Sequence, residues 1–119
     1  MKYDPELLLQ LAELIEAKPD KDVLLIDQIQ LPELSRDELV EHLRLLLEAH
    51  LILATIQYAD GKVVQVRITG LTRKGLQFLM YARDIVWQEK FLREARIDAG
   101  SITREGFLVA LASHFPNYL

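Results

Sequence analysis

The hydrophobic period changes within residues 35–75, and this change constrains the fold of the whole chain. Apolar residues first recur every three or four positions, which predicts a helix from Ser35 to Ala49 with one buried face: Leu39, Val40, Leu43, Leu46 and Leu47. They then alternate with other residues over 51–58 and again over 63–69, as in half-buried strands. Asp60-Gly61 between the strands is a strong hairpin signal. The sequence therefore predicts a helix followed by a two-stranded hairpin.

Capping residues mark where two helices begin. Ser35 and Glu38 have the spacing of a capping box, in which each side chain satisfies a backbone N–H at the helix start. Asp4 followed by Pro5 predicts the start of an N-terminal helix. This helix is expected to end near Ala17, because the residue before a proline resists helical dihedrals.

Residues 22–31 lie between these two helices and are rich in β-branched and other apolar side chains. This composition favours a strand over a short helix, but the pattern alone leaves both open. A strand here would mean that the usual middle helix of a helix-turn-helix is replaced or degraded.

Thr72 is predicted to cap a long helix that continues to about Ile97. Its apolar residues fall on two faces, so one face needs a cover beyond the domain's own core. The cover is either a last helix or a second subunit. The last helix, capped by Ser101 or Thr103, offers these apolar residues: Phe107, Leu108, Leu111 and Phe115. We expect a homodimer with this interface: Met80, Trp87, Phe91 and Leu92.

Together these elements predict one α+β domain over residues 1–119, a winged helix-turn-helix-like domain with a two-stranded wing. Residues 1–70 would form the helices and the wing, and residues 71–119 the long helix and the C-terminal helix. Half of the 119 residues are hydrophobic, which is enough for one core without disulfide or metal staples.

Several classes of function are disfavoured by what the sequence lacks. There is no cysteine, which excludes disulfides and thiolate metal sites. No apolar run approaches the roughly 20 residues of a membrane span, and the first residues lack a signal-peptide pattern, so we expect a cytoplasmic protein. Glycine-rich phosphate loops, H-E-x-x-H and G-x-S-x-G are absent, so we expect no enzymatic activity, cofactor or metal.

Two histidines have simple structural interpretations. His42 follows Glu38 by four residues, but two ligands without a third are weak evidence for a metal, and a hydrogen-bonded or solvated histidine is favoured. His50 follows the helix end, where left-handed dihedrals are common, so we expect a structural cap.

Four blocks of the sequence resemble an uncharacterised family of small phage and prophage proteins: E-H-L-R-L-L-L-E-A-H-L-I at 41–52, L-T-R-K-G-L-Q-F-L at 71–79, Arg83-Asp84 with Trp87, and G-S-I-T at 100–103. His50 stands where that family has glycine. The first two blocks are also similar to bacterial winged-helix repressors. The resemblance implies a winged-helix-like fold and a phage-associated origin, and it implies no activity or site residues.

The charge distribution bears on the partner. Residues 1–60 carry 5 Lys or Arg and 13 Asp or Glu, whereas residues 61–119 carry 9 and 5. The helix before a wing normally enters the DNA major groove, but here its outward face carries four carboxylates, which oppose binding to phosphates: Asp37, Glu38, Glu41 and Glu48. We therefore predict wing-led contacts to nucleic acid, with double-stranded DNA as the candidate partner.

The cations predicted to make these contacts are Arg36, Arg44, Lys62, Arg67, Arg73 and Lys74. The alternative is an adaptor that uses an acidic winged-helix scaffold to bind a host or phage protein, without binding DNA.

Overall fold

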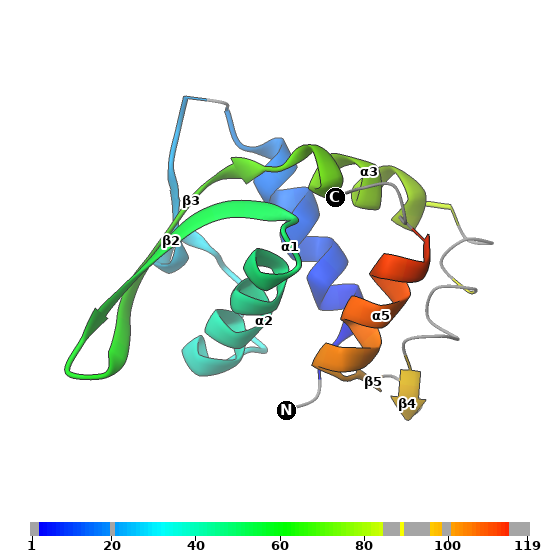
Figure 1. Ribbon diagram of the computed structural model, residues 1–119. Coiled ribbons are helices and arrows are strands. Elements are labelled where there is room, and N and C mark those ends of the chain that lie inside the picture. The colour runs from blue at the N-terminus through cyan, green and yellow to red at the C-terminus, as the bar shows by residue number, and fades with distance from the viewer. Residues whose placement is uncertain (1–2, 20, 85–88, 90–95, 99–100, 115–119) are drawn as a thin grey trace.

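A computed structural model describes residues 3–19, 21–84, 89, 96–98 and 101–114 (Figure 1). Its elements are α1 (Pro5–Ala17), β1 (Leu24–Leu25), the short 3-10 helix η1 (Ile26–Gln28), α2 (Arg36–Glu48), β2 (Ile52–Ala59), β3 (Lys62–Leu71), α3 (Arg73–Ala82), β4 (Arg96–Asp98), β5 (Ser101–Ile102) and α5 (Arg104–His114). The fold is α+β, as predicted. In the described part, four α-helices accompany an antiparallel sheet in the order β1-β3-β2 and a small sheet formed by β4 and β5.

The predicted caps are present. Ser35 Oγ accepts a hydrogen bond of 3.1 Å from the Glu38 backbone, and Glu38 accepts one from the Ser35 N–H at 3.4 Å, which completes the capping box of α2. Asp4 caps α1 by accepting from the Glu6 N–H at 2.9 Å. Helix starts were therefore correctly predicted from local spacing.

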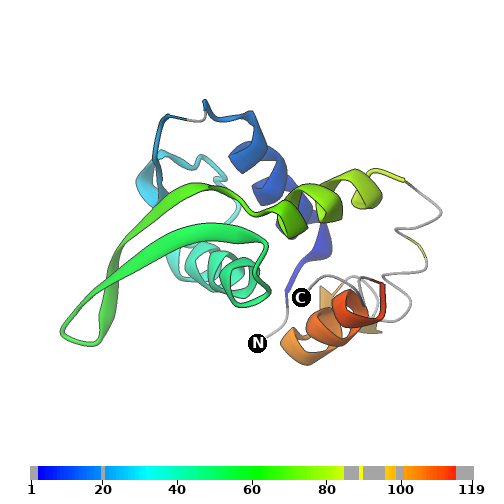
Figure 2. The same ribbon diagram turned by 45° about the horizontal axis from the view of Figure 1, so that its top comes forward.

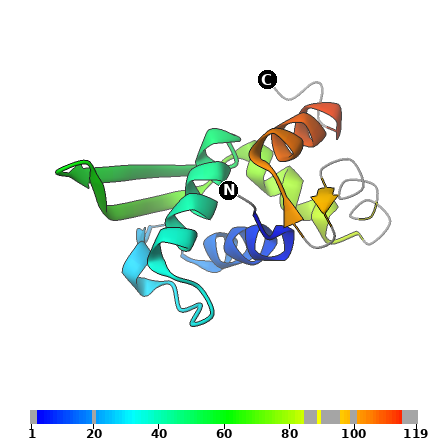
Figure 3. The same ribbon diagram turned by 90° about the horizontal axis from the view of Figure 1, so that it is seen from below.

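The β2–β3 hairpin projects from the helical body (Figures 1 and 3). Its turn has positive φ at Asp60 (53°) and Gly61 (76°), the dihedrals that favour this residue pair in tight hairpins. The register between β2 and β3 shifts next to this turn: Tyr58 pairs with Val63, whereas Gln57 pairs with Gln65. Val64 is the extra residue of a β-bulge at this point, and its side chain is turned outward.

The segment between α1 and α2 is part strand and part helix. Leu24 and Leu25 pair with Ile68 and Arg67 of β3, which makes β1 an edge of the sheet. The next three residues form η1 and bury Ile26. Of the two alternatives for residues 22–31, the strand is present over two residues and a short 3-10 helix over the next three.

The prediction of one helix from Thr72 to Ile97 is wrong. Helix α3 ends at Ala82, the chain turns with Asp84 N–H donating to the Tyr81 carbonyl at 3.0 Å, and Arg96–Asp98 forms β4. Helical periodicity does not distinguish one long helix from a helix that stops and lets the chain fold back. The chain folds back so that β5 pairs with Tyr3 through reciprocal hydrogen bonds with Ile102.

Helix α5 covers the inner face of α3. Phe107 of α5 packs edge-to-face on Phe78 of α3, with ring centroids 5.9 Å apart. Phe107 and Leu111 are buried, so the C-terminal helix is the cover for this face of α3. Among the described residues, no helix is long and apolar enough to cross a membrane.

Candidate nucleic-acid interface

Four cations of the hairpin and of α3 have no ion pair or hydrogen bond to their side chains within the described part of the chain: Lys62, Arg67, Arg73 and Lys74. The first three are exposed and Lys74 is half-buried. Residues 61–83 contain no Asp or Glu that would neutralise them. This segment therefore carries unpaired positive charge, and we call these four residues the β3 cation row.

The β3 cation row is extended along the molecule. Strand β3 runs from the hairpin turn to the start of α3 (Figures 1 and 2). Lys62 opens this strand, Arg67 lies in its middle on the exposed face, and Arg73 follows its far end. The 10 residues of β3 span about 33 Å at the usual rise of a strand. The cations therefore line a path comparable in length to one turn of duplex DNA, about 34 Å.

Arg36, the first of the two predicted cations on α2, is bound to the hairpin. Its guanidinium donates to the carbonyl oxygens of Val63 at 3.3 Å and Val64 at 2.9 Å, and its Nε lies 3.7 Å from an Asp27 carboxylate oxygen. The bulge makes both of these consecutive carbonyls available to one guanidinium. Arg36 thus joins the start of α2 to β3.

Arg44 is engaged in a similar way further along α2. Its Nη2 donates to the Tyr58 hydroxyl at 3.2 Å, and its Nη1 lies 3.3 Å from Glu41 Oε1. Its Nε is buried and has no hydrogen-bond partner in the described structure. Arg36 and Arg44 therefore hold the hairpin against α2, and the carboxylates Asp37, Glu38 and Glu48 are exposed on that helix.

The junction between the hairpin and α3 explains two of the sequence blocks. Thr72 Oγ1 donates to the His50 carbonyl at 2.6 Å and accepts from the Gly75 N–H at 3.0 Å, so one hydroxyl caps α3 and connects it to the end of α2. A Cβ on Gly75 would lie 2.0 Å from the Leu51 carbonyl oxygen, so only glycine permits this close approach. His50 has φ 61°, which confirms its predicted role as a helix cap.

This junction positions Arg73 and Lys74 in the first turn of α3, which contains no acidic residue. The backbone N–H groups at a helix start already carry partial positive charge, so cations there are normally disfavoured. Their position concentrates positive potential at the base of the hairpin.

His42 is hydrogen-bonded, the first of the two predicted alternatives, and it is buried in the core rather than solvated. Its Nε2 accepts from the Asp4 N–H at 3.0 Å, so the proton lies on Nδ1, which donates to the Glu38 carbonyl at 2.7 Å. Tyr3 packs edge-to-face on the ring at 5.2 Å. No three His, Asp or Glu side chains in the described ranges are grouped to hold a metal ion.

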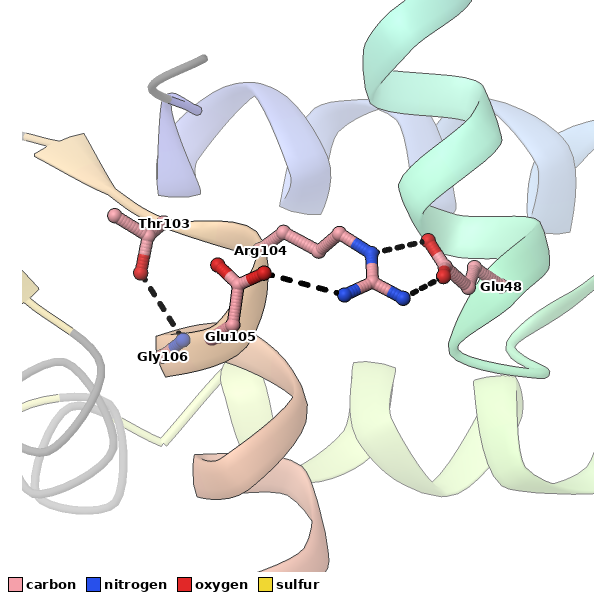
Figure 4. Close-up of polar contacts among 5 residues, drawn as sticks. All are labelled: Glu48, Thr103, Arg104, Glu105 and Gly106. Atoms are coloured by element: carbon pink, nitrogen blue, oxygen red, sulfur yellow. Dashed lines mark hydrogen bonds and ion pairs between the residues drawn. The ribbon is translucent and has the colours of Figure 1, made fainter.

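A bidentate ion pair attaches α5 to the end of α2 (Figure 4). Arg104 donates from Nη2 to Glu48 Oε1 and from Nε to Glu48 Oε2 at 2.8 Å, and Glu105 lies 3.3 Å from the same guanidinium. The hydrogen bonds from Arg104 lower the pKa of Glu48 and raise the pKa of Arg104. The Glu48–Arg104 pair therefore connects the C-terminal helix to the acidic side of α2. Near this pair, burial is the main cause that raises the pKa of Tyr3, and the Glu41 and Glu48 carboxylates raise it further.

Of the four residues predicted to form a dimer interface, the structure places only Met80. Its side chain is 68% exposed, and Leu76 one turn earlier is 47% exposed. Trp87, Phe91 and Leu92 lie outside the described residues.

The model of a family described as "Hypothetical protein (DUF2513)", a domain of unknown function, matches residues 2–101. No curated protein and no solved structure matches the chain. Because the family model covers most of the 119 residues, the chain belongs to the DUF2513 family.

Proposed function

We propose that the protein is a non-enzymatic winged-helix module that binds double-stranded DNA through its hairpin and the start of α3. The order α1, β1, α2, β2, β3 supports this interpretation, because it is the order of elements in winged helix-turn-helix domains with η1 in place of the middle helix. The β2–β3 hairpin is then the wing. The phage association implied by the sequence resemblance belongs to the same proposal.

The observation that carries the proposal is the β3 cation row. Lys62, Arg67, Arg73 and Lys74 lack partners in the described structure, and no carboxylate interrupts residues 61–83. Unpaired cations spaced along a strand and the start of the next helix can contact phosphates of a duplex, and phosphate contacts position a protein without selecting a sequence. We therefore expect weak sequence specificity.

Helix α2 has a supporting role in this proposal. Arg36 and Arg44 are bonded to the hairpin, so their predicted contacts with nucleic acid would require those bonds to break. The remaining exposed charges of α2 are carboxylates, which repel phosphate. Contacts made mainly by the hairpin would not require these bonds to break and would not bring the α2 carboxylates close to phosphate.

Fluorescence anisotropy with a short labelled duplex tests the proposal. With four phosphate contacts, the logarithm of the association constant should fall with the logarithm of salt concentration at a slope of about −3 to −4. Arg67→Glu should weaken binding and reduce the slope, whereas Lys21→Glu, an equal charge change at an exposed loop position, should have a much smaller effect. No binding by the unmodified protein at about 50 mM salt would refute the proposal.

The acidic face of α2 favours the alternative function, an adaptor for a host or phage protein that does not bind DNA. A pull-down from the native host, analysed for both nucleic acid and protein, separates the two. Recovery of one stoichiometric protein, unaffected by nuclease and by Arg67→Glu, would favour the adaptor.

We also propose that the protein forms a homodimer through the outer face of α3. Leu76 and Met80 are one turn apart on that face and remain exposed after α5 has covered Phe78. A twofold axis at this face would bring together the same apolar patch from each subunit and would double the number of phosphate contacts.

A further inference from the structure

A groove separates α1 from the loop that leads into α2. It is lined by four residues of α1, Gln10, Glu13, Leu14 and Ala17, and by three of the loop, Gln30, Leu31 and Glu33, and has a volume of about 510 Å³. A second hollow of about 430 Å³ lies over Ile29, Gln30, Leu31 and Pro32. The two share Gln30 and Leu31, so the depression continues across the loop. Figure 3 shows this loop beside α1.

The floor of the groove is apolar and belongs to a second stripe of α1. Leu8, Leu11 and Ile15 form the stripe buried in the core. Leu14 and Ala17 lie off that stripe, three residues apart, and Leu14 is 42% exposed. Leu31 faces them from the loop and is half-buried. The groove thus offers aliphatic surface that the described part of the chain leaves open.

The charged residues of the groove are both acidic. Glu13 contributes a carboxylate from α1 and Glu33 one from the loop, and the lining contains no Lys or Arg. Neither carboxylate has an ion pair with another described residue. Such a groove repels phosphate and attracts cations, so a nucleic acid does not fit it.

We propose that this groove docks a short basic segment of a partner protein. An aliphatic side chain of the partner would rest on Leu14 and Leu31, and flanking Lys or Arg side chains would face Glu13 and Glu33. The continuation over the loop fits an extended peptide. The groove shares no residue with the β3 cation row, so this proposal stands independently of DNA binding, and together the two would let the module connect a basic protein to DNA.

Nuclear magnetic resonance (NMR) of the full-length, ¹⁵N-labelled protein tests the proposal, because it detects weak binding and locates it. The probe is a capped synthetic peptide with one leucine between two pairs of lysines. We expect amide shift changes concentrated at Gln10, Glu13, Leu14, Ala17, Gln30 and Leu31. A peptide with serine in place of leucine should bind more weakly, and one with glutamate in place of lysine should not bind.

Protein variants provide matched controls. Glu13→Gln and Glu33→Gln should each weaken peptide binding by about 1.4- to fivefold, the range for exposed ion pairs, whereas Glu6→Gln on the same helix but outside the groove should not. Leu14→Ser should weaken binding more strongly and leave the spectrum dispersed, because Leu14 is outside the core.

Three results would overturn the proposal. One is no shift change at millimolar peptide. Another is equal binding of the leucine and serine peptides with changes spread over all acidic positions, which would mean non-specific attraction. The third is a shift of the groove signals with protein concentration alone, which would assign the groove to a second copy of the chain.

Discussion

The Arg36 guanidinium donates a 2.9 Å hydrogen bond to the carbonyl oxygen of Val64, the extra residue of the β3 bulge beside the hairpin turn. The two residues are 28 positions apart in the sequence. This bond connects the first turn of α2 to the hairpin and uses a cation that the sequence alone assigns to nucleic acid. Because Arg36 is engaged within the fold, it is not among the cations that are free to contact a partner.

Replacing Arg36 by alanine tests this assignment. We expect Arg36→Ala to lower the free energy of unfolding by about 0.5–1.5 kcal/mol, the usual net contribution of a hydrogen bond, because the bulge carbonyls lose their donor. Urea denaturation measures this loss, with Lys21→Ala as the exposed control. If Arg36→Ala abolished DNA binding without any loss of stability, Arg36 would instead be a direct contact.

Gly75 offers a sharp test of the junction beneath α3. Gly75→Ala places a Cβ 2.0 Å from the Leu51 carbonyl oxygen, so we expect a loss of about 1–3 kcal/mol or more from overpacking against backbone. Gly70→Ala is the matched control, because its Cβ would meet nothing within 4 Å. Equal denaturation midpoints for the two variants would contradict the close approach.

Leu43 lies at the centre of the buried face of α2. Leu43→Ala should cost about 2–5 kcal/mol, through lost transfer free energy and the cavity left behind. Leu76→Ala removes the same atoms from a side chain that is 47% exposed and should cost much less. Glu41→Ala should be nearly neutral, since its pair with Arg44 lies at the surface. Similar losses at Leu43 and Leu76 would show that the helix faces are misassigned.

The Glu48–Arg104 pair predicts how stability depends on pH. The pKa of Glu48 is lowered in the folded state from its ordinary value of 4.5, chiefly by the hydrogen bonds from Arg104. A carboxyl group whose pKa is lower in the folded state stabilises the fold above its unfolded pKa, and the contribution is lost as pH falls through the folded pKa. We therefore expect the stabilisation from Glu48 to be present at neutral pH and to decline below about 4.5.

Denaturation midpoints measured from neutral to acid pH check this prediction. Glu48→Gln should make the acid decline shallower, and Arg104→Met should produce the same flattening because it removes the partner. The double variant should add little to either single one. An unchanged pH profile in Glu48→Gln would exclude the pair as a source of acid sensitivity.

The proposed homodimer is tested by light scattering at tens of micromolar protein. We expect twice the chain mass of 13.7 kDa, and Met80→Lys should shift the mass towards that of the monomer with the fold retained. Val109→Lys, at a side chain on α5 that is 66% exposed, is the control and should leave the mass unchanged. A monomer mass for the unmodified protein would refute the dimer.

Local features of the fold were predictable from the sequence, and features set by distant contacts were not. The capping box at Ser35 and the turn at Asp60-Gly61 depend on neighbours within three residues, so their spacing is sufficient to predict them. The end of α3 at Ala82 was missed, because helical periodicity carries no information about where the chain folds back. The bulge at Val64 could likewise not be predicted from the spacing of residues in the sequence.

The same distinction between local and distant contacts applies to the candidate site. The cations of the β3 cation row were identifiable because a hairpin and the start of the next helix follow from local pattern. That Arg36 and Arg44 are bonded to the hairpin depends on carbonyl and hydroxyl groups brought together only by the tertiary fold. The groove beside Leu14 was not predicted, since no local pattern shows how the 29–34 loop lies relative to α1.

The bulge at Val64 also bears on whether β3 can pair with a strand of another molecule. Strand β1 pairs with β3 only at Ile68 and Arg67, so the remaining length of β3 has no strand on that side within the described structure. An open strand edge is where another molecule can add a strand and begin to aggregate. The bulge interrupts the regular spacing of β3, and Arg36 occupies the Val63 and Val64 carbonyls with a charged group. An incoming strand would have to displace that guanidinium, so we expect Arg36 to hinder strand addition on this side of β3.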